Sequence, residues 1–155
     1  MPTDPTRQAA QEFLAEKRTQ DFEAQEARLN HEAAVRLCRV VWKRFSDTVL
    51  AKCKEWNEVT GEETLSCKET LLGDLRIRCV GRPHQLTMHL DPDKLLITLK
   101  NTARAEFEKD VVLQIEGYAT ESERDARTYH AGSAANLDVI LLAEFRVLAG
   151  MSSQR

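Results

Sequence analysis

The sequence alternates between apolar and polar residues from Asp74 to Tyr118, in four successive segments. Side chains alternate between the two faces of a β-strand, so each segment predicts a strand with one apolar face. A slip of one residue between neighbours would turn every apolar side chain outward, which restricts the pairing strongly. We therefore predict an antiparallel meander with one buried face and one mixed polar face. The segments are DLRIRCV, QLTMHL, LLITLK and VVLQIEGY.

The turns between these segments predict the register of the strands. The first turn, at residues 81–84, places Ile77 opposite Met88. The second turn, at residues 91–94, reads DPDK, in which proline presets φ and aspartate caps the local backbone. All four strands agree on which face is buried, and this agreement of pattern with turn chemistry favours the meander. The expected apolar pairs are Ile77 with Met88, Met88 with Ile97, and Ile97 with Leu113.

The polar face of the predicted sheet carries the main candidate site. Arg76 and Arg78 project from one strand and His89 from the next, with Arg76 expected opposite His89. An antiparallel sheet commonly has one solvated face, which is the simpler interpretation. The alternative is a face that binds an anion or an acidic partner through arginine and a titratable histidine. Tyr118, at the end of the fourth segment, completes the candidate ligand-binding set.

Two amphipathic helices are predicted to cover the apolar face. Apolar residues recur at three- and four-residue steps over residues 30–57, and again over residues 137–148. Residues 65–69 can add a fifth strand at the edge of the sheet, where Cys67 would approach Cys79. The predicted fold class is α+β, with an antiparallel four- or five-stranded meander sheet packed by a long N-terminal helix and a C-terminal helix.

The first 29 residues are rich in good helix formers but contain few large apolar residues. One interpretation is a single helix from about residue 5 to about residue 58, roughly 80 Å long at 1.5 Å per residue. Such an arm would extend beyond a small domain and need a partner, which favours self-association. The other interpretation is a separate, partly mobile helix that folds back on the domain or is frayed. The predicted organisation is a helical extension over 1–29, one α+β domain over 30–150 and a tail over 151–155.

Other polar segments carry weaker candidates. Residues 116–133 are predicted to form a long charged connection, in which Tyr129 and His130 are a candidate binding pair. His89 precedes the DPD turn, but the turn itself explains both aspartates, so no metal site is predicted. Acidic residues on the third connection are candidate acids or bases, although charged loops commonly have this composition. They are Glu106, Glu108 and Asp110.

Composition narrows the class of protein. A chain of 155 residues can bury one core without a metal or disulfide, and 42% hydrophobic with 30% charged residues is typical of a soluble protein. The formal charge of -3 makes nucleic-acid binding an unfavourable hypothesis. Because there is neither a signal-peptide pattern nor an apolar run that could cross a membrane, a cytoplasmic location without membrane association is expected. The four cysteines lack metal-site spacing and are predicted to be free thiols.

No catalytic or nucleotide-binding motif is present, and no motif identifies a protein family. The leading hypothesis is a non-enzymatic binding or assembly module that forms a homo-oligomer, or binds a protein partner, through its helical parts. It requires no cofactor. The alternative is a small-molecule or anion-binding protein, or an enzyme, with a pocket between the sheet and the helices. That pocket would open near Arg76, Arg78, His89 and Tyr118.

Overall fold

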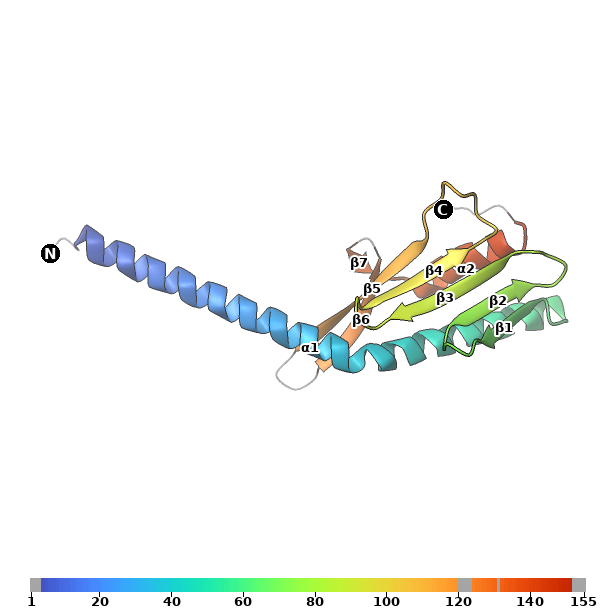
Figure 1. Cartoon of the computed structure of the whole chain (residues 1–155), viewed down its shortest axis with the longest axis horizontal. Helices are drawn as coiled ribbons and strands as arrows, with labels where there is room; N and C mark the ends of the chain where they lie inside the picture. Colours follow the sequence, from blue (N-terminus) through green and yellow to red (C-terminus); the bar gives the residue numbers. More distant parts are fainter. Residues whose placement is uncertain (1–3, 120–123, 131, 152–155) are drawn as a thin grey trace.

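The computed structural model describes residues 4–119, 124–130 and 132–151. It has the predicted α+β class, with a long helix first, an antiparallel sheet next and a short helix last (Figure 1). The elements are α1 (Pro5–Thr60), β1 (Leu65–Glu69), β2 (Leu75–Cys79), β3 (Gln85–Asp91), β4 (Leu96–Asn101), β5 (Val111–Ala119), β6 (Arg124–His130), β7 (Ser133–Ala134) and α2 (Leu137–Leu148).

Helix α1 runs without a break for 56 residues, so the structure has the single long helix and not the folded-back one. At its start, Oδ1 of Asp4 accepts a hydrogen bond from the backbone N–H of Thr6 at 3.0 Å. Pro5 occupies the first turn, where a missing N–H costs nothing. At its end, Gly61 adopts φ +73°, which glycine reaches without a Cβ clash, and its N–H donates to the carbonyl of Asn57. At 1.5 Å per residue, α1 is about 84 Å long.

Only the second half of α1 packs on the sheet. Residues 4–28 are all exposed, and Figure 1 shows this part of the helix projecting away from the sheet. We call residues 5–28 the arm. The buried stripe of α1 begins beyond it and faces the strands; its members are Ala33, Ala34, Cys38, Val41, Phe45, Val49 and Cys53. The transition follows the sequence, because large apolar residues recur at helical spacing only in the second half.

The sheet has seven strands, which lie in chain order from β1 to β7 with every neighbouring pair antiparallel. The predicted number of four or five is therefore too low, although the edge strand expected at residues 65–69 is present as β1. Strands β6 and β7 come from the segment interpreted as a long connection, so Tyr129 and His130 lie on a strand. Strand β6 reads RDARTYH, in which no apolar alternation could reveal it.

Two of the three predicted strand registers are wrong by two residues. A shift of two residues keeps every side chain on its own face, so the hydrophobic pattern cannot distinguish the two registers. The position of each turn decides between them. The β2–β3 turn is centred one residue earlier than expected, and the β3–β4 turn is centred one residue later. On the polar face, Arg76 consequently lies opposite Thr87 and not His89. The observed apolar pairs are Ile77 with Leu86, Met88 with Leu99, and Ile97 with Leu113, of which the last is as predicted.

Helices α1 and α2 lie on the same face of the sheet, where they cover its apolar side (Figure 1). The ring of Trp56 in α1 meets that of Phe145 in α2 edge-to-face, with centroids 6.3 Å apart, which joins the two helices. We call the other side of the sheet the outer face. It carries the polar residues of the strands, and no described helix covers it. The largest fully buried side chains are Phe45, Leu65, Ile77, Leu86, Met88, Ile97, Leu99, Leu113, Ile115, Leu141, Leu148 and Glu144.

Candidate anion-binding site on the outer face of the sheet

Cationic side chains cross the outer face in one row. Arg76 of β2 lies directly opposite Lys68 of β1 on one side and Thr87 of β3 on the other. Thr87 in turn lies opposite Lys100 of β4. All three cationic residues of this row are exposed. Neighbouring strands are about 4.8 Å apart, and like charges directly opposite each other destabilise a sheet. An anion bound between Lys68 and Arg76 would remove that repulsion.

Arg78 adds a further positive charge beside the row. It lies opposite Ser66 on one side and Gln85 on the other, and its Nη2 donates a hydrogen bond to Oε1 of Gln85 at 3.3 Å. Within the described part of the chain, Lys68, Arg76 and Arg78 form no ion pair with a carboxylate. Their charges are therefore available to a ligand.

A cavity of about 650 Å³ opens among these side chains. The sequence placed a pocket near Arg76 and Arg78 between the sheet and the helices, whereas this cavity lies on the outer face, beside the β1–β2 hairpin. Two carboxylates, Glu69 and Asp74, share its wall with three cationic groups. The residues around it are Ser66, Lys68, Glu69, Thr70, Leu71, Leu72, Asp74, Arg76, Arg78 and Thr87.

His89 lies beside the cavity and is joined to it through Asp74. The distance from Nδ1 of His89 to Oδ1 of Asp74 is 2.6 Å. An ionised carboxylate can only accept hydrogen bonds, so Nδ1 is the protonated nitrogen and donates. The His89 side chain is 56% exposed and that of Asp74 is 22% exposed. The hydrogen bond holds the carboxylate at the cavity wall, where it lowers the positive potential.

Tyr118 is not brought to the two arginines. It lies in β5 opposite Asp125, and two strands separate β5 from β2. Its side chain lies outside the described residues. Sequence reasoning missed Lys68, which contributes the third cation. The signal was weak, because Lys68 belongs to a short edge strand whose formation the sequence left open.

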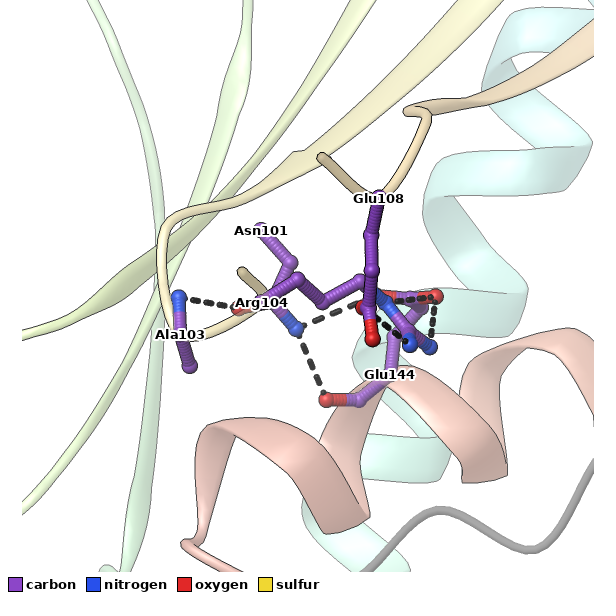
Figure 2. A network of polar contacts seen from close by, with 5 residues as sticks. All are labelled: Asn101, Ala103, Arg104, Glu108 and Glu144. Carbon is purple, nitrogen blue, oxygen red and sulfur yellow. Dashed lines mark hydrogen bonds and ion pairs between the residues drawn. The ribbon is translucent and has the colours of Figure 1, made fainter. Parts of the chain in front are cut away.

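A second polar cluster is buried between the β4–β5 connection and α2 (Figure 2). Nη2 of Arg104 donates to Oε1 of Glu144 at 2.6 Å, and Nε of Arg104 lies 3.1 Å from both carboxylate oxygens. Nη1 of Arg104 also donates to Oε2 of Glu108 at 3.2 Å. Asn101 adds hydrogen bonds from Nδ2 to the backbone carbonyl of Glu144 at 3.1 Å and to its Oε2 at 3.0 Å.

This cluster has a structural role. The side chains of Arg104 and Glu144 are only 7% and 3% exposed, so each charge depends on the other for its stabilisation. The hydrogen bond to Glu144 raises the pKa of the Arg104 guanidinium above its ordinary value. Glu108, a candidate acid or base from the sequence, also pairs with Arg104. The bonds that Arg104 and Asn101 make to Glu144 clamp the β4–β5 connection onto α2, whereas Glu108 pairs with Arg104 within the connection.

Within residues 4–119, 124–130 and 132–151, no group of three or more His, Cys, Asp and Glu side chains is placed to hold a metal ion. None of the helices in the same ranges is long and apolar enough to cross a membrane. Comparison with known protein families, with curated proteins and with solved structures found no match to this chain.

Proposed function

We propose that the protein is a non-enzymatic assembly and binding module that self-associates through the arm of α1. The observation that carries this proposal is that every residue from 4 to 28 is exposed, although the segment is helical throughout. Three bulky apolar residues on it face solvent: Phe13 is 66% exposed, Leu14 50% and Phe22 66%. Most helical stability in proteins comes from packing of an apolar face and not from propensity, so contact with a second helix would stabilise the arm.

The arrangement of the apolar residues indicates which side of the arm makes that contact. At 3.6 residues per turn, Leu14 and Phe22 of the arm and the half-buried Leu29 just beyond it fall within about 80° of one another around the helix axis. Phe13 falls about 180° from Phe22 and so lies on the opposite side. We call the side with Leu14, Phe22 and Leu29 the arm stripe. A second copy of the chain can bury this stripe by packing its own arm against it.

Sedimentation velocity of the full chain over a range of concentrations tests the assembly. We expect a mass above that of the monomer, and we expect Leu14→Ser with Phe22→Ser to shift the chain toward the monomer. Removal of residues 1–29 should have the same effect. Phe13→Ser is the matched control, because Phe13 and Phe22 are equally exposed but lie on opposite sides of the helix.

Two results would contradict this proposal. A wild-type chain that sediments as a monomer at all concentrations would rule out self-association. Equal losses of assembly in the Phe13→Ser and Phe22→Ser variants would show that the arm stripe is not the contact.

A second function, anion binding, is favoured by the cavity on the outer face. We infer that an anionic group binds between Lys68 and Arg76, with Arg78 beside it. Three cations without a carboxylate partner border one cavity, and two of them repel each other across the strand ladder. Arginine also offers a planar fork of donors that matches the oxygens of a phosphate or carboxylate group.

Calorimetric titration with inorganic pyrophosphate tests the second function. Binding should weaken with added salt, because solvent-exposed charges are screened. Arg76→Ala with Arg78→Ala should abolish it. Arg7→Ala with Arg18→Ala removes the same charge from the arm and should leave the affinity unchanged. If both double variants lose affinity equally, the binding reflects net charge and not this cavity.

A further inference from the structure

Two cysteine thiols from different elements meet at the edge of the sheet. Cys53 lies in α1 and is buried, and Cys67 lies in the edge strand β1 and is half-buried. Both side chains line one cavity, and each thiol is near enough to shift the pKa of the other. The strand register does not place Cys67 directly opposite Cys79, because Cys67 lies opposite Ile77 and Cys79 lies opposite Leu65. The pairing of interest is therefore between helix and strand, and not the one between strands that the sequence raised.

The two elements are held together next to the thiols. Nδ2 of Asn57, one helical turn beyond Cys53, donates to the backbone carbonyl of Leu65 at 2.9 Å. The backbone N–H of Leu65 donates back to Oδ1 of Asn57 at 2.9 Å. This reciprocal pair of hydrogen bonds fixes the start of β1 against α1, two residues before Cys67. The proximity of the thiols is therefore a property of the fold.

The two cysteines border a cavity at the surface. A cavity of about 510 Å³ opens beside α1 and β1, and both Cys53 and Cys67 line it. Its charged lining residues are Lys54 and three glutamates, which are Glu58, Glu62 and Glu63. This excess of negative charge repels anionic reagents, so a neutral oxidant is favoured over an anionic disulfide such as oxidised glutathione.

The two thiols differ in pKa and in exposure, which gives them different roles in oxidation. Donation from the Cys53 S–H lowers the pKa of Cys67, against the opposing effect of burial. The same hydrogen bond, together with burial, raises the pKa of Cys53. The thiolate is the nucleophilic form of cysteine, and Cys67 is half-buried whereas Cys53 is buried. Cys67 therefore attacks first, and Cys53 follows as the resolving thiol.

We propose that Cys53 and Cys67 form a reversible dithiol–disulfide pair that is oxidised by a neutral peroxide. In the first step the Cys67 thiolate attacks one peroxide oxygen. An S–O bond forms, the O–O bond breaks, and the other oxygen leaves as hydroxide. In the second step the Cys53 sulfur attacks the Cys67 sulfur. An S–S bond forms, the S–O bond breaks, and water leaves with the Cys53 proton. The peroxide is reduced, and a dithiol reductant reverses the change.

Peptide mapping of the full chain after treatment with hydrogen peroxide tests this proposal. We expect a disulfide-linked pair of peptides containing Cys53 and Cys67, a loss of two titratable thiols per chain, and recovery of both with dithiothreitol. Cys38 and Cys79 are buried and do not line the cavity that Cys53 and Cys67 share, so Cys38→Ala with Cys79→Ala is the control that should leave the linkage intact.

Single variants separate the two roles. Cys53→Ala should leave Cys67 as a sulfenic acid that dimedone traps, and Cys67→Ala should leave Cys53 unoxidised under the same conditions. The wild-type mapping needs no variant to fold. The proposal is overturned if Cys67 oxidises no faster than Cys38 and Cys79, or if the linked peptides join Cys67 to any thiol other than Cys53.

Discussion

The α-carbon of Gly117 in β5 lies directly against the main chain of α1 at Ala34. A Cβ at position 117 would overlap the backbone nitrogen of Ala34 and the carbonyl oxygen of Asn30, and it would lie 3.0 Å from the carbonyl carbon of Ala33. Ala33 and Ala34 are themselves 0% and 1% exposed. Helix and strand thus approach backbone to backbone, and only small residues allow this distance.

Gly117→Ala should destabilise the fold by at least about 2 kcal/mol, because the added methyl group can be accommodated only by moving the main chain of α1. Urea unfolding followed by circular dichroism measures the effect. Glu116→Ala, at the exposed neighbouring position, should change the free energy of unfolding by no more than about 0.5 kcal/mol. Equal stabilities for the Gly117→Ala variant and the wild type would show that α1 does not pack this closely.

Breaking the Arg104–Glu144 pair from either side should be costly. Glu144→Leu leaves a buried guanidinium without its main partner and should lower the free energy of unfolding by about 3 kcal/mol. Arg104→Met should act similarly, and the double variant should cost less than the sum, with a coupling of about 1–3 kcal/mol. A thermodynamic cycle by urea unfolding gives these values. Glu106→Ala on the same connection is the exposed control, and additive effects would refute the coupling.

The reactivity of Cys67 should depend on Cys53. Because the hydrogen bond from Cys53 lowers the pKa of Cys67, the thiolate forms at lower pH in the wild type than without that donor. Cys53→Ala should therefore move the pH dependence of Cys67 alkylation by iodoacetamide to higher pH and slow the reaction at neutral pH. Peptide-resolved mass spectrometry measures each cysteine separately. An unchanged profile would mean that the two thiols do not interact.

Asp74→Asn should strengthen binding of pyrophosphate at the outer face. The substitution removes one negative charge from the cavity wall while keeping a side chain of similar size. Exposed charge pairs contribute about 0.2–1 kcal/mol, so affinity should rise up to about fivefold. The gain should shrink in high salt. Calorimetry of the variant checks this, and weaker binding would mean that Asp74 helps to position the ligand.

Backbone protection of the arm should depend on protein concentration. The arm makes no buried contact within its own chain, so its amides should exchange rapidly when the protein is dilute. They should become protected as self-association buries the arm stripe. Hydrogen–deuterium exchange with mass spectrometry can follow this region alongside the buried half of α1, which should stay protected throughout. Slow exchange of the arm at high dilution would contradict a partner-dependent arm.

The sequence predicted the faces of the strands better than their partners. Alternation determines that Ile77 points inward and Arg76 outward, and this holds for either register. The opposing residue depends on where each turn is centred, and turn position leaves no trace in the alternation. For that reason Arg76 was correctly placed on the outer face but assigned to His89 instead of Thr87.

Features that depend on distant residues were not predictable in the same way. Arg104 and Glu144 are separated by forty positions along the chain, and each alone resembles an ordinary surface residue. Strand β6 is polar and forms because β5 offers it an unpaired edge. Lys68 lies beside Arg76 in the candidate site only because β1 pairs with β2.

The continuity of α1 makes the arm a rigid lever. Because the same helix runs from the arm into the core, the arm cannot turn independently without breaking backbone hydrogen bonds. Residues 5–28 are about 36 Å long at 1.5 Å per residue, so a tilt of about 5° at the core would move the tip by about 3 Å. The packing of Ala33 and Ala34 against Gly117 therefore sets the position of any partner bound at the tip.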